Sequence, residues 1–161
     1  METKKIKGYS LVETIVYLAI FTVMSIVVIN SFIIILSSFN TTNMNRRLLE
    51  SGMTSMERLS REIRQASSVN ASSTSTMLIL NDSGTATTEF VNENGSLNLY
   101  KNGNLEGNLL GSKLTITSLN FNHITTTKSE AVRVRMTLQY LNGKTTKSAN
   151  FYDTIILRGS Y

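Results

Sequence analysis

Residues 8–13 are the part of this chain that is best placed to take part in chemistry. Gly8 ends a basic peptide, METKKIKG, and a long apolar run begins just after it. A glycine at this junction supplies the easily extended backbone that suits a protease cleft. Glu13 is a lone carboxylate at the edge of the apolar run, and a charge at the centre of a bilayer costs about 2.5 kcal/mol or more.

The residue types around Glu13 indicate what could neutralise its charge. If the chain is cut after Gly8, Tyr9 gains a free amino group, and this ammonium on a neighbouring helix would pair with the Glu13 carboxylate. The alternative is that Glu13 only reaches into the lipid headgroups and that the segment is a simple amino-terminal anchor.

Other groups that could support catalysis or metal binding are sparse. His123 is the only histidine, and its neighbours give no metal-ligand spacing, so we expect a surface histidine on a strand. Two pairs of acids could meet around loops and hold a hard cation such as calcium, but scattered loop acids are usually only solvated. These pairs are Asp82 with Glu89 and Glu93 with Glu106. The sequence has no phosphate-binding glycine loop, and we expect no enzyme activity, catalytic residue, metal or cofactor.

Composition sets further limits on the function. The 161 residues permit one globular domain beyond an apolar helix. The absence of cysteine excludes disulfides, thiolate metal sites and a cysteine nucleophile. The net charge of +5 falls to about +3 when residues 1–8, with three lysines and one glutamate, are left out. This charge is too small to indicate a nucleic-acid partner by itself.

The elements that must position Glu13 begin with a membrane span. Residues 15–39 contain no Asp, Glu, Lys or Arg, and roughly 20 apolar residues suffice to cross a bilayer core of about 30 Å. The run is too long for the apolar core of an ordinary secretory signal. Since positive charge beside a span is retained in the cytoplasm, we predict a cytoplasmic amino terminus and a chain that lies on the other side of the membrane after about residue 40.

Residues 40–66 predict an amphipathic continuation of the same helix. The apolar stripe has spacings of three and four residues and consists of Leu49, Met53, Met56, Leu59 and Ile63. Two opposite-charge pairs four residues apart, Glu57 with Arg61 and Arg58 with Glu62, indicate a solvated face. Gly52 is the predicted place for a bend.

The remainder predicts a linker followed by an antiparallel sheet. The linker is the small and polar stretch at residues 67–76, and the head spans residues 77–161. Asn-Gly pairs at 94–95, 102–103 and 142–143 separate alternating runs and indicate hairpins. The expected strands are Met77 to Asn81, Glu89 to Asn92, Ser96 to Lys101, Lys113 to Ile124, Glu130 to Leu141 and Thr145 to Leu157. Apolar side chains alternate from Val132 to Tyr140, so that strand should place one face on a core.

The stretch Lys5-Ile6-Lys7-Gly8-Tyr9-Ser10-Leu11-Val12-Glu13 resembles the class III signal of type IV prepilins and type II secretion pseudopilins. That signal is a basic leader, Gly, an aromatic that is usually Phe, Ser or Thr, Leu, a hydrophobic residue and Glu. Tyr9 in place of Phe is the one departure, and the match covers about the first 35 residues. The resemblance implies an α+β, pilin-like fold with a leader at 1–8, a transmembrane and filament-core helix at 9–39, and a stem helix packed on a β-rich head.

The resemblance also implies partners and processing. A membrane-embedded prepilin peptidase would cut between Gly8 and Tyr9 and methylate the Tyr9 amine, and Glu13 would guide assembly with other pilin subunits at the pilus assembly platform. The segment from Met56 to Ala66 resembles the stem of the J and W group of minor subunits, as do shorter later segments around Phe121, Arg133 and Arg158. This favours a minor, tip-associated subunit. A major pilin, a secretion pseudopilin, a competence minor pilin and a tip module that binds DNA, a surface or cargo remain alternatives.

Overall fold

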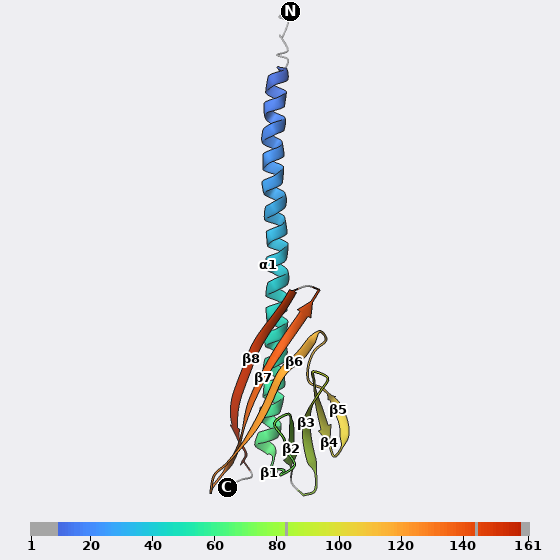
Figure 1. Ribbon diagram of the computed structural model, residues 1–161, viewed down its shortest axis with the longest axis vertical. Helices are drawn as coiled ribbons and strands as arrows, with labels where there is room; N and C mark the ends of the chain where they lie inside the picture. The colour runs from blue at the N-terminus through green and yellow to red at the C-terminus, as the bar shows by residue number, and fades with distance from the viewer. Residues whose placement is uncertain (1–9, 83, 144, 159–161) are drawn as a thin grey trace, which may run out of the picture. The chain divides into compact units, whose positions relative to one another are not determined.

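The computed structural model describes residues 10–82, 84–143 and 145–158. It is an α+β structure in which a long amino-terminal helix, α1 (Leu11–Gln65), precedes strands that form antiparallel sheets (Figure 1). The predicted fold class is therefore confirmed. The chain divides into two compact units, the first ending at Thr42 and the second beginning at Asn43.

The first unit is a helix whose apolar side chains are exposed. Its large hydrophobic residues from Leu11 to Phe39 remain between 48% and 75% exposed. Most of its hydroxyls donate within the helix: Ser25 Oγ donates to the Phe21 carbonyl and Ser31 Oγ to the Val27 carbonyl, both at 2.8 Å. This pattern suits an apolar solvent, where every polar group needs an internal partner. The helix is long and apolar enough to cross a membrane, which is consistent with a single-pass anchor.

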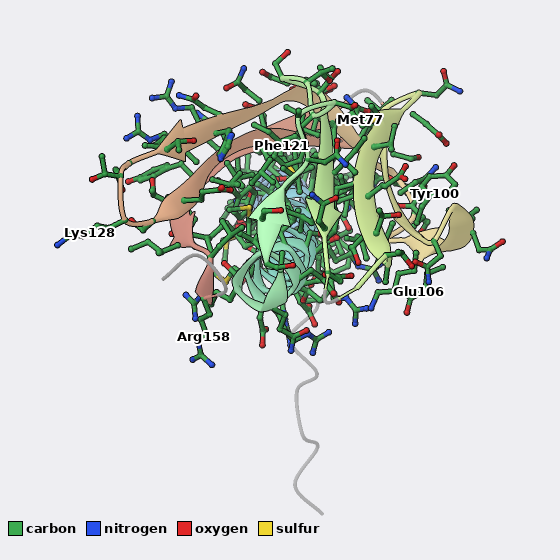
Figure 2. The ribbon with its side chains drawn as sticks, turned by 90° about the horizontal axis from the view of Figure 1, so that it is seen from below. Met77, Tyr100, Glu106, Phe121, Lys128 and Arg158 are labelled. Atoms are coloured by element: carbon green, nitrogen blue, oxygen red, sulfur yellow. The ribbon has the colours of Figure 1, made fainter. Side chains whose placement is uncertain are left out.

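The second unit contains two antiparallel sheets, each with its strands in chain order. The larger sheet consists of β1 (Ser68–Val69), β2 (Met77–Asn81), β3 (Thr87–Glu93), β4 (Ser96–Lys101) and β5 (Asn104–Asn108). The smaller sheet consists of the long strands β6 (Leu114–Thr125), β7 (Glu130–Asn142) and β8 (Thr145–Ile156). Within this unit the strands curve around the end of α1, as the view along the helix shows (Figure 2).

The predicted Asn-Gly hairpins are confirmed. Asn94 and Gly95 have φ of 52° and 81°, and Asn102 and Gly103 have φ of 51° and 76°. Positive φ at both central residues is the backbone of a type I′ turn, whose twist matches that of paired strands. Gly143, between β7 and β8, has φ of 60°. The six predicted strands lie within a few residues of their expected bounds, and the structure adds β1 and β5.

One core joins the two sheets and the residues of α1 in the second unit. On β7, alternate residues from Val132 to Tyr140 are buried, as their alternation predicts. Phe90 and Leu99 contribute from the larger sheet, and Leu59 and Ile63 from α1. The inner face of the smaller sheet therefore packs on the helix, and its other face is left without a covering layer among the described residues.

The helix face that packs on this core differs from the predicted stripe. Leu59 and Ile63 are buried and Met56 is partly buried, but Leu49 and Met53 are 44% and 63% exposed. The prediction was wrong for these two residues because the buried face includes residue types that do not count as apolar. The buried helix residues are Met44, Leu48, Gly52, Ser55, Leu59, Glu62 and Ile63.

Gly52 marks the close approach of helix and sheet, and α1 is unbroken through it. A Cβ atom at this position would overlap Cζ of Phe151 on β8. The missing side chain therefore makes room for the phenyl ring.

The predicted linker at residues 67–76 contains β1 and is tied to the head. Ser68 and Val69 pair with Asn81 and Leu80 of β2. The backbone N–H of Val69 also donates to Glu130 Oε2 at 3.0 Å. These bonds fix the start of the segment against both sheets.

Candidate functional site

Of the three predicted site residues, Gly8 and Tyr9 lie outside the described residues, and Glu13 lies in the first turn of α1. A carboxylate there interacts favourably with the positive end of the helix dipole. Tyr17 Oη donates a hydrogen bond of 2.9 Å to Glu13 Oε1. Within the part of the chain that the structure describes, Glu13 has no cationic partner. Sequence reasoning missed Tyr17, although its spacing of four residues places it on the same helix face.

Four of the five groups considered as metal ligands, His123, Asp82, Glu93 and Glu106, have protein partners. His123 is exposed on β6, as predicted, and its Nε2 lies 3.2 Å from Glu130 Oε2. Asp82 Oδ2 accepts a 2.7 Å hydrogen bond from Thr88 Oγ1. The Tyr100 hydroxyl lies 2.9 Å from Glu93 Oε1, and this hydrogen bond raises the pKa of Tyr100 above its ordinary value. Among the described residues no three His, Asp or Glu side chains form a metal-binding group.

A four-residue charged network, Arg58, Glu62, Lys101 and Glu106, joins α1 to the hairpin of β4 and β5. Arg58 Nη2 lies 2.9 Å from Glu62 Oε1 and 3.5 Å from Glu106 Oε1. Lys101 Nζ lies 3.4 Å from Glu62 Oε2 and 3.9 Å from Glu106 Oε2. Each cation therefore contacts both carboxylates.

Glu62 is the buried member of this network. It is only 5% exposed. The prediction of a solvated pair between Arg58 and Glu62 was therefore right about the contact and wrong about its surroundings. Desolvation makes such a charge dependent on its partners. The predicted pair of Glu57 with Arg61 is not an ion pair within the described part of the chain.

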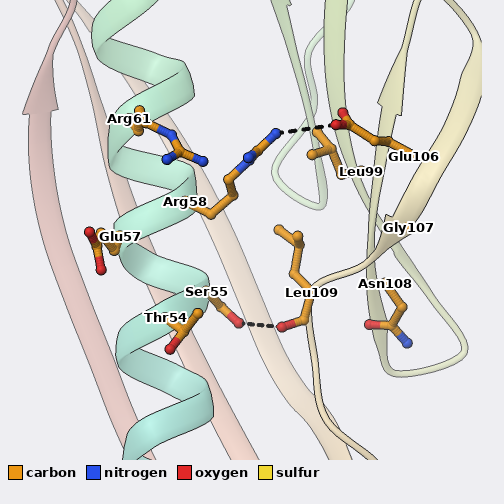
Figure 3. Close-up of a pocket in the computed structure, with 10 residues that line it drawn as sticks. All are labelled: Thr54, Ser55, Glu57, Arg58, Arg61, Leu99, Glu106, Gly107, Asn108 and Leu109. Carbon is orange, nitrogen blue, oxygen red and sulfur yellow. Dashed lines mark hydrogen bonds and ion pairs between the residues drawn. The ribbon is translucent and has the colours of Figure 1, made fainter.

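A cleft of about 450 Å³ lies beside this network, between α1 and β5 (Figure 3). Ser55 Oγ donates to the Leu109 carbonyl at 2.9 Å and closes one end. Arg58 and Arg61 line the helix side, and Glu106 lines the strand side. Arg58 Nε is buried without a hydrogen-bond partner among the described residues. The charged residues of the lining are two arginines and two carboxylates, Arg58, Arg61, Glu57 and Glu106.

A second groove, of about 520 Å³, lies between α1 and β8. Ser60 Oγ of the helix lies 3.1 Å from Asp153 Oδ2 of the strand. Arg61, Arg64 and Arg158 line the groove together with Glu57 and Asp153. Its mixture of charges again fits a surface that holds helix and sheet together.

The structure thus has two features that bear on function. One is an apolar helix with a carboxylate in its first turn, and the other is a separately packed head. No protein-family model, curated protein or solved structure matches the chain. The functional argument therefore rests on the residues and their geometry.

Proposed function

We propose that this protein is a minor, tip-associated structural subunit of a type IV pilus-like filament. The observation that carries the proposal is the form of α1: one continuous helix with Glu13 in its first turn, exposed apolar side chains through its first unit, and a buried face against antiparallel sheets in its second. The prepilin-like signal at residues 5–13 adds the route of processing. In this proposal, prepilin peptidase cuts after Gly8 and methylates Tyr9.

The apolar helix would have two successive environments. Before assembly, it would span the membrane as a single-pass anchor with a cytoplasmic amino terminus. After assembly, it would pack with the helices of other subunits in the filament core, outside the membrane. Both environments are apolar, so the intrahelical bonds of its serine and threonine hydroxyls would serve in each.

Glu13 would be the residue that favours assembly of the subunit into the filament over its retention in the membrane. Its carboxylate has a hydrogen bond from Tyr17 but no cation within the described residues. The Tyr9 ammonium of a neighbouring subunit would supply the missing charge. Such a pair in an apolar core is strongly favoured over either charge alone, because removal of one partner of a buried pair costs about 3 to 5 kcal/mol.

The second unit would form the exposed head of the subunit. Leu49 and Met53 lie on the solvent-facing side of α1 in this unit and offer apolar surface to adjacent subunits. The charged network and the two grooves act in this proposal as structural joints, and the subunit needs no catalytic residue.

Replacement of Glu13 tests this proposal. Glu13→Ala should still be inserted and processed, but its ratio of sheared filament protein to membrane protein should fall at least about tenfold, as loss of a buried charge pair predicts. Glu50→Ala is the matched control, since Glu50 is an exposed acid on the same helix. Quantitative immunoblotting of both fractions measures the ratio. An unchanged ratio for Glu13→Ala would show that Glu13 plays no part in assembly.

A further inference from the structure

The outer face of the smaller sheet carries a pattern of side chains to which the proposed filament role assigns no part. The register places Arg133 beside Asn122 of β6 and Thr154 of β8. The next outward row places Arg135 beside Asn120 and Tyr152. We call these six residues the polar patch. It belongs entirely to the second unit, so the inference does not depend on whether the chain forms a filament.

The patch has positive charge with no carboxylate among its outward neighbours. The outward positions of β6, β7 and β8 hold no Asp or Glu. The two acids of these strands lie on the inner face, where Asp153 contacts Ser60 and Glu130 accepts a hydrogen bond from the Val69 N–H. Among the described residues, Arg133 Nε donates to Thr154 Oγ1 at 3.4 Å, and neither patch arginine has an ion pair. Since residues two apart on a strand are roughly 6.8 Å from each other, the two guanidinium groups form a short cationic row.

Neutral polar groups and one aromatic ring surround this row. Tyr152 is 83% exposed and stands directly across from Arg135. Asn120 and Asn122 offer amide donors and acceptors on the other side, and both are exposed. The patch therefore combines charge recognition, hydroxyl recognition and an apolar ring face on a surface that β-pairing keeps rigid.

This combination fits an acidic polysaccharide better than other polymers. Guanidinium groups bind carboxylates through paired hydrogen bonds, amides suit the many hydroxyls of a sugar, and a tyrosine ring can cover the apolar face of a sugar ring. Single-stranded nucleic acid would need several stacking aromatics, whereas Tyr152 is the aromatic member of the patch. A protein partner would need an apolar centre, and the apolar row of this face, Ile124, Ala131 and Ile156, lies at the edge of the patch beyond Arg133 and not at its centre.

We propose that the polar patch is a binding surface for an acidic polysaccharide. Arg133 and Arg135 bind sugar carboxylates, Asn120, Asn122 and Thr154 bind hydroxyls, and Tyr152 stacks on one ring. The site takes an extended chain because the residues lie in open rows and not in a closed pocket.

Isothermal titration calorimetry tests the proposal by measuring the affinity of the full chain, in neutral detergent micelles, for four polymers. The probes are polygalacturonate, neutral dextran, poly-glutamate with carboxylates but no sugar, and oligothymidylate. Polygalacturonate should bind at least about tenfold more tightly than each of the others. The double variant Arg133→Gln with Arg135→Gln should lose at least about tenfold in affinity, since it removes two charge-assisted contacts. Tyr152→Ser should weaken binding several-fold.

The matched control is Arg46→Gln with Arg47→Gln, which removes the same charge from exposed positions of α1 and should leave the affinity unchanged. If the Arg133 and Arg135 double variant fails to fold by circular dichroism, Arg135→Gln and Tyr152→Ser at exposed positions provide the same test. No binding of polygalacturonate, equal binding of any other probe, or equal losses in the control variant would each overturn the proposal.

Discussion

Glu62 is the buried charged residue in the contact between α1 and the larger sheet. Its carboxylate is nearly inaccessible and contacts Arg58 at 2.9 Å and Lys101 at 3.4 Å. The side chains of these cations are 27% and 41% exposed, so they can still reach water if Glu62 is lost. The free energy of unfolding lost with Glu62 should therefore lie between the loss expected for a solvated ion pair and the loss expected for a fully buried one.

Glu62→Gln should lower the free energy of unfolding by about 1 to 2 kcal/mol, because it leaves two cations with only Glu106 between them. Glu57→Gln, on the same helix but exposed, should change it by less than about 0.5 kcal/mol. Urea unfolding of each variant in neutral detergent, monitored by far-ultraviolet circular dichroism, measures both changes in the free energy of unfolding. Equal small effects would mean that the network contributes nothing to stability.

Gly52 supports a second prediction at the residue scale. Alanine there would gain about 1 kcal/mol in helix propensity, but its Cβ would overlap three atoms of the Phe151 ring, Cζ, Cε1 and Cε2. Overpacking of this kind costs about 1 to 3 kcal/mol, so Gly52→Ala should lower the melting temperature. In a Phe151→Ala background the same change should raise it. A rise in both backgrounds would show that helix and β8 do not meet at Gly52.

At the scale of elements, sequence reasoning succeeded where local chemistry determines the structure. The strands were predictable because Asn-Gly turns and alternating side chains act over a few residues, as from Val132 to Tyr140. β5 was missed because residues 104–108 are short, polar and largely exposed, although the Asn102-Gly103 turn before them was a usable signal. β1 was missed because it is held by partners distant in the chain, namely β2 and Glu130.

The helix face and the charged network could not be predicted because they depend on tertiary contacts. Gly52, Ser55 and Glu62 are buried through a close ring contact, a hydrogen bond to Leu109 and ion pairs, none of which has a local signature. Glu57 with Arg61 and Arg58 with Glu62 have the same spacing, yet only the second pair forms within the described residues. Glu13 could be proposed as a site residue from the sequence because its charge contrasts with its own neighbours along the chain.

Paired substitutions on the buried face and on the exposed face of α1 should have different effects on the stability of the head. Leu48→Ala with Ile63→Ala removes two buried side chains and should cost about 2 to 5 kcal/mol for each, enough to unfold a head of ordinary stability. Leu49→Ala with Met53→Ala alters the exposed side and should leave the melting temperature nearly unchanged. Thermal melts of both double variants provide the comparison. Equal destabilisation by the two pairs would contradict the assigned core.

At the scale of the whole molecule, the chain combines two units with opposite solvent requirements. The first exposes its apolar side chains along the helix and suits a lipid or protein environment. The second closes a core of its own from both sheets and its part of α1. A subunit that leaves a membrane to join a filament needs this division, because only the apolar helix must exchange one environment for another.

The amino terminus of the protein in its assembled form tests filament export most directly. Mass spectrometry of sheared surface filaments and of membranes, from the cells that make the protein, identifies that terminus in each fraction. The filament protein should begin at Tyr9 with a methylated amine, and Gly8→Glu should hold the full-length precursor in the membrane. Filament protein that still carries residues 1–8, or a mature chain that begins elsewhere, would contradict the proposed processing and the assembly role of Glu13 that depends on it.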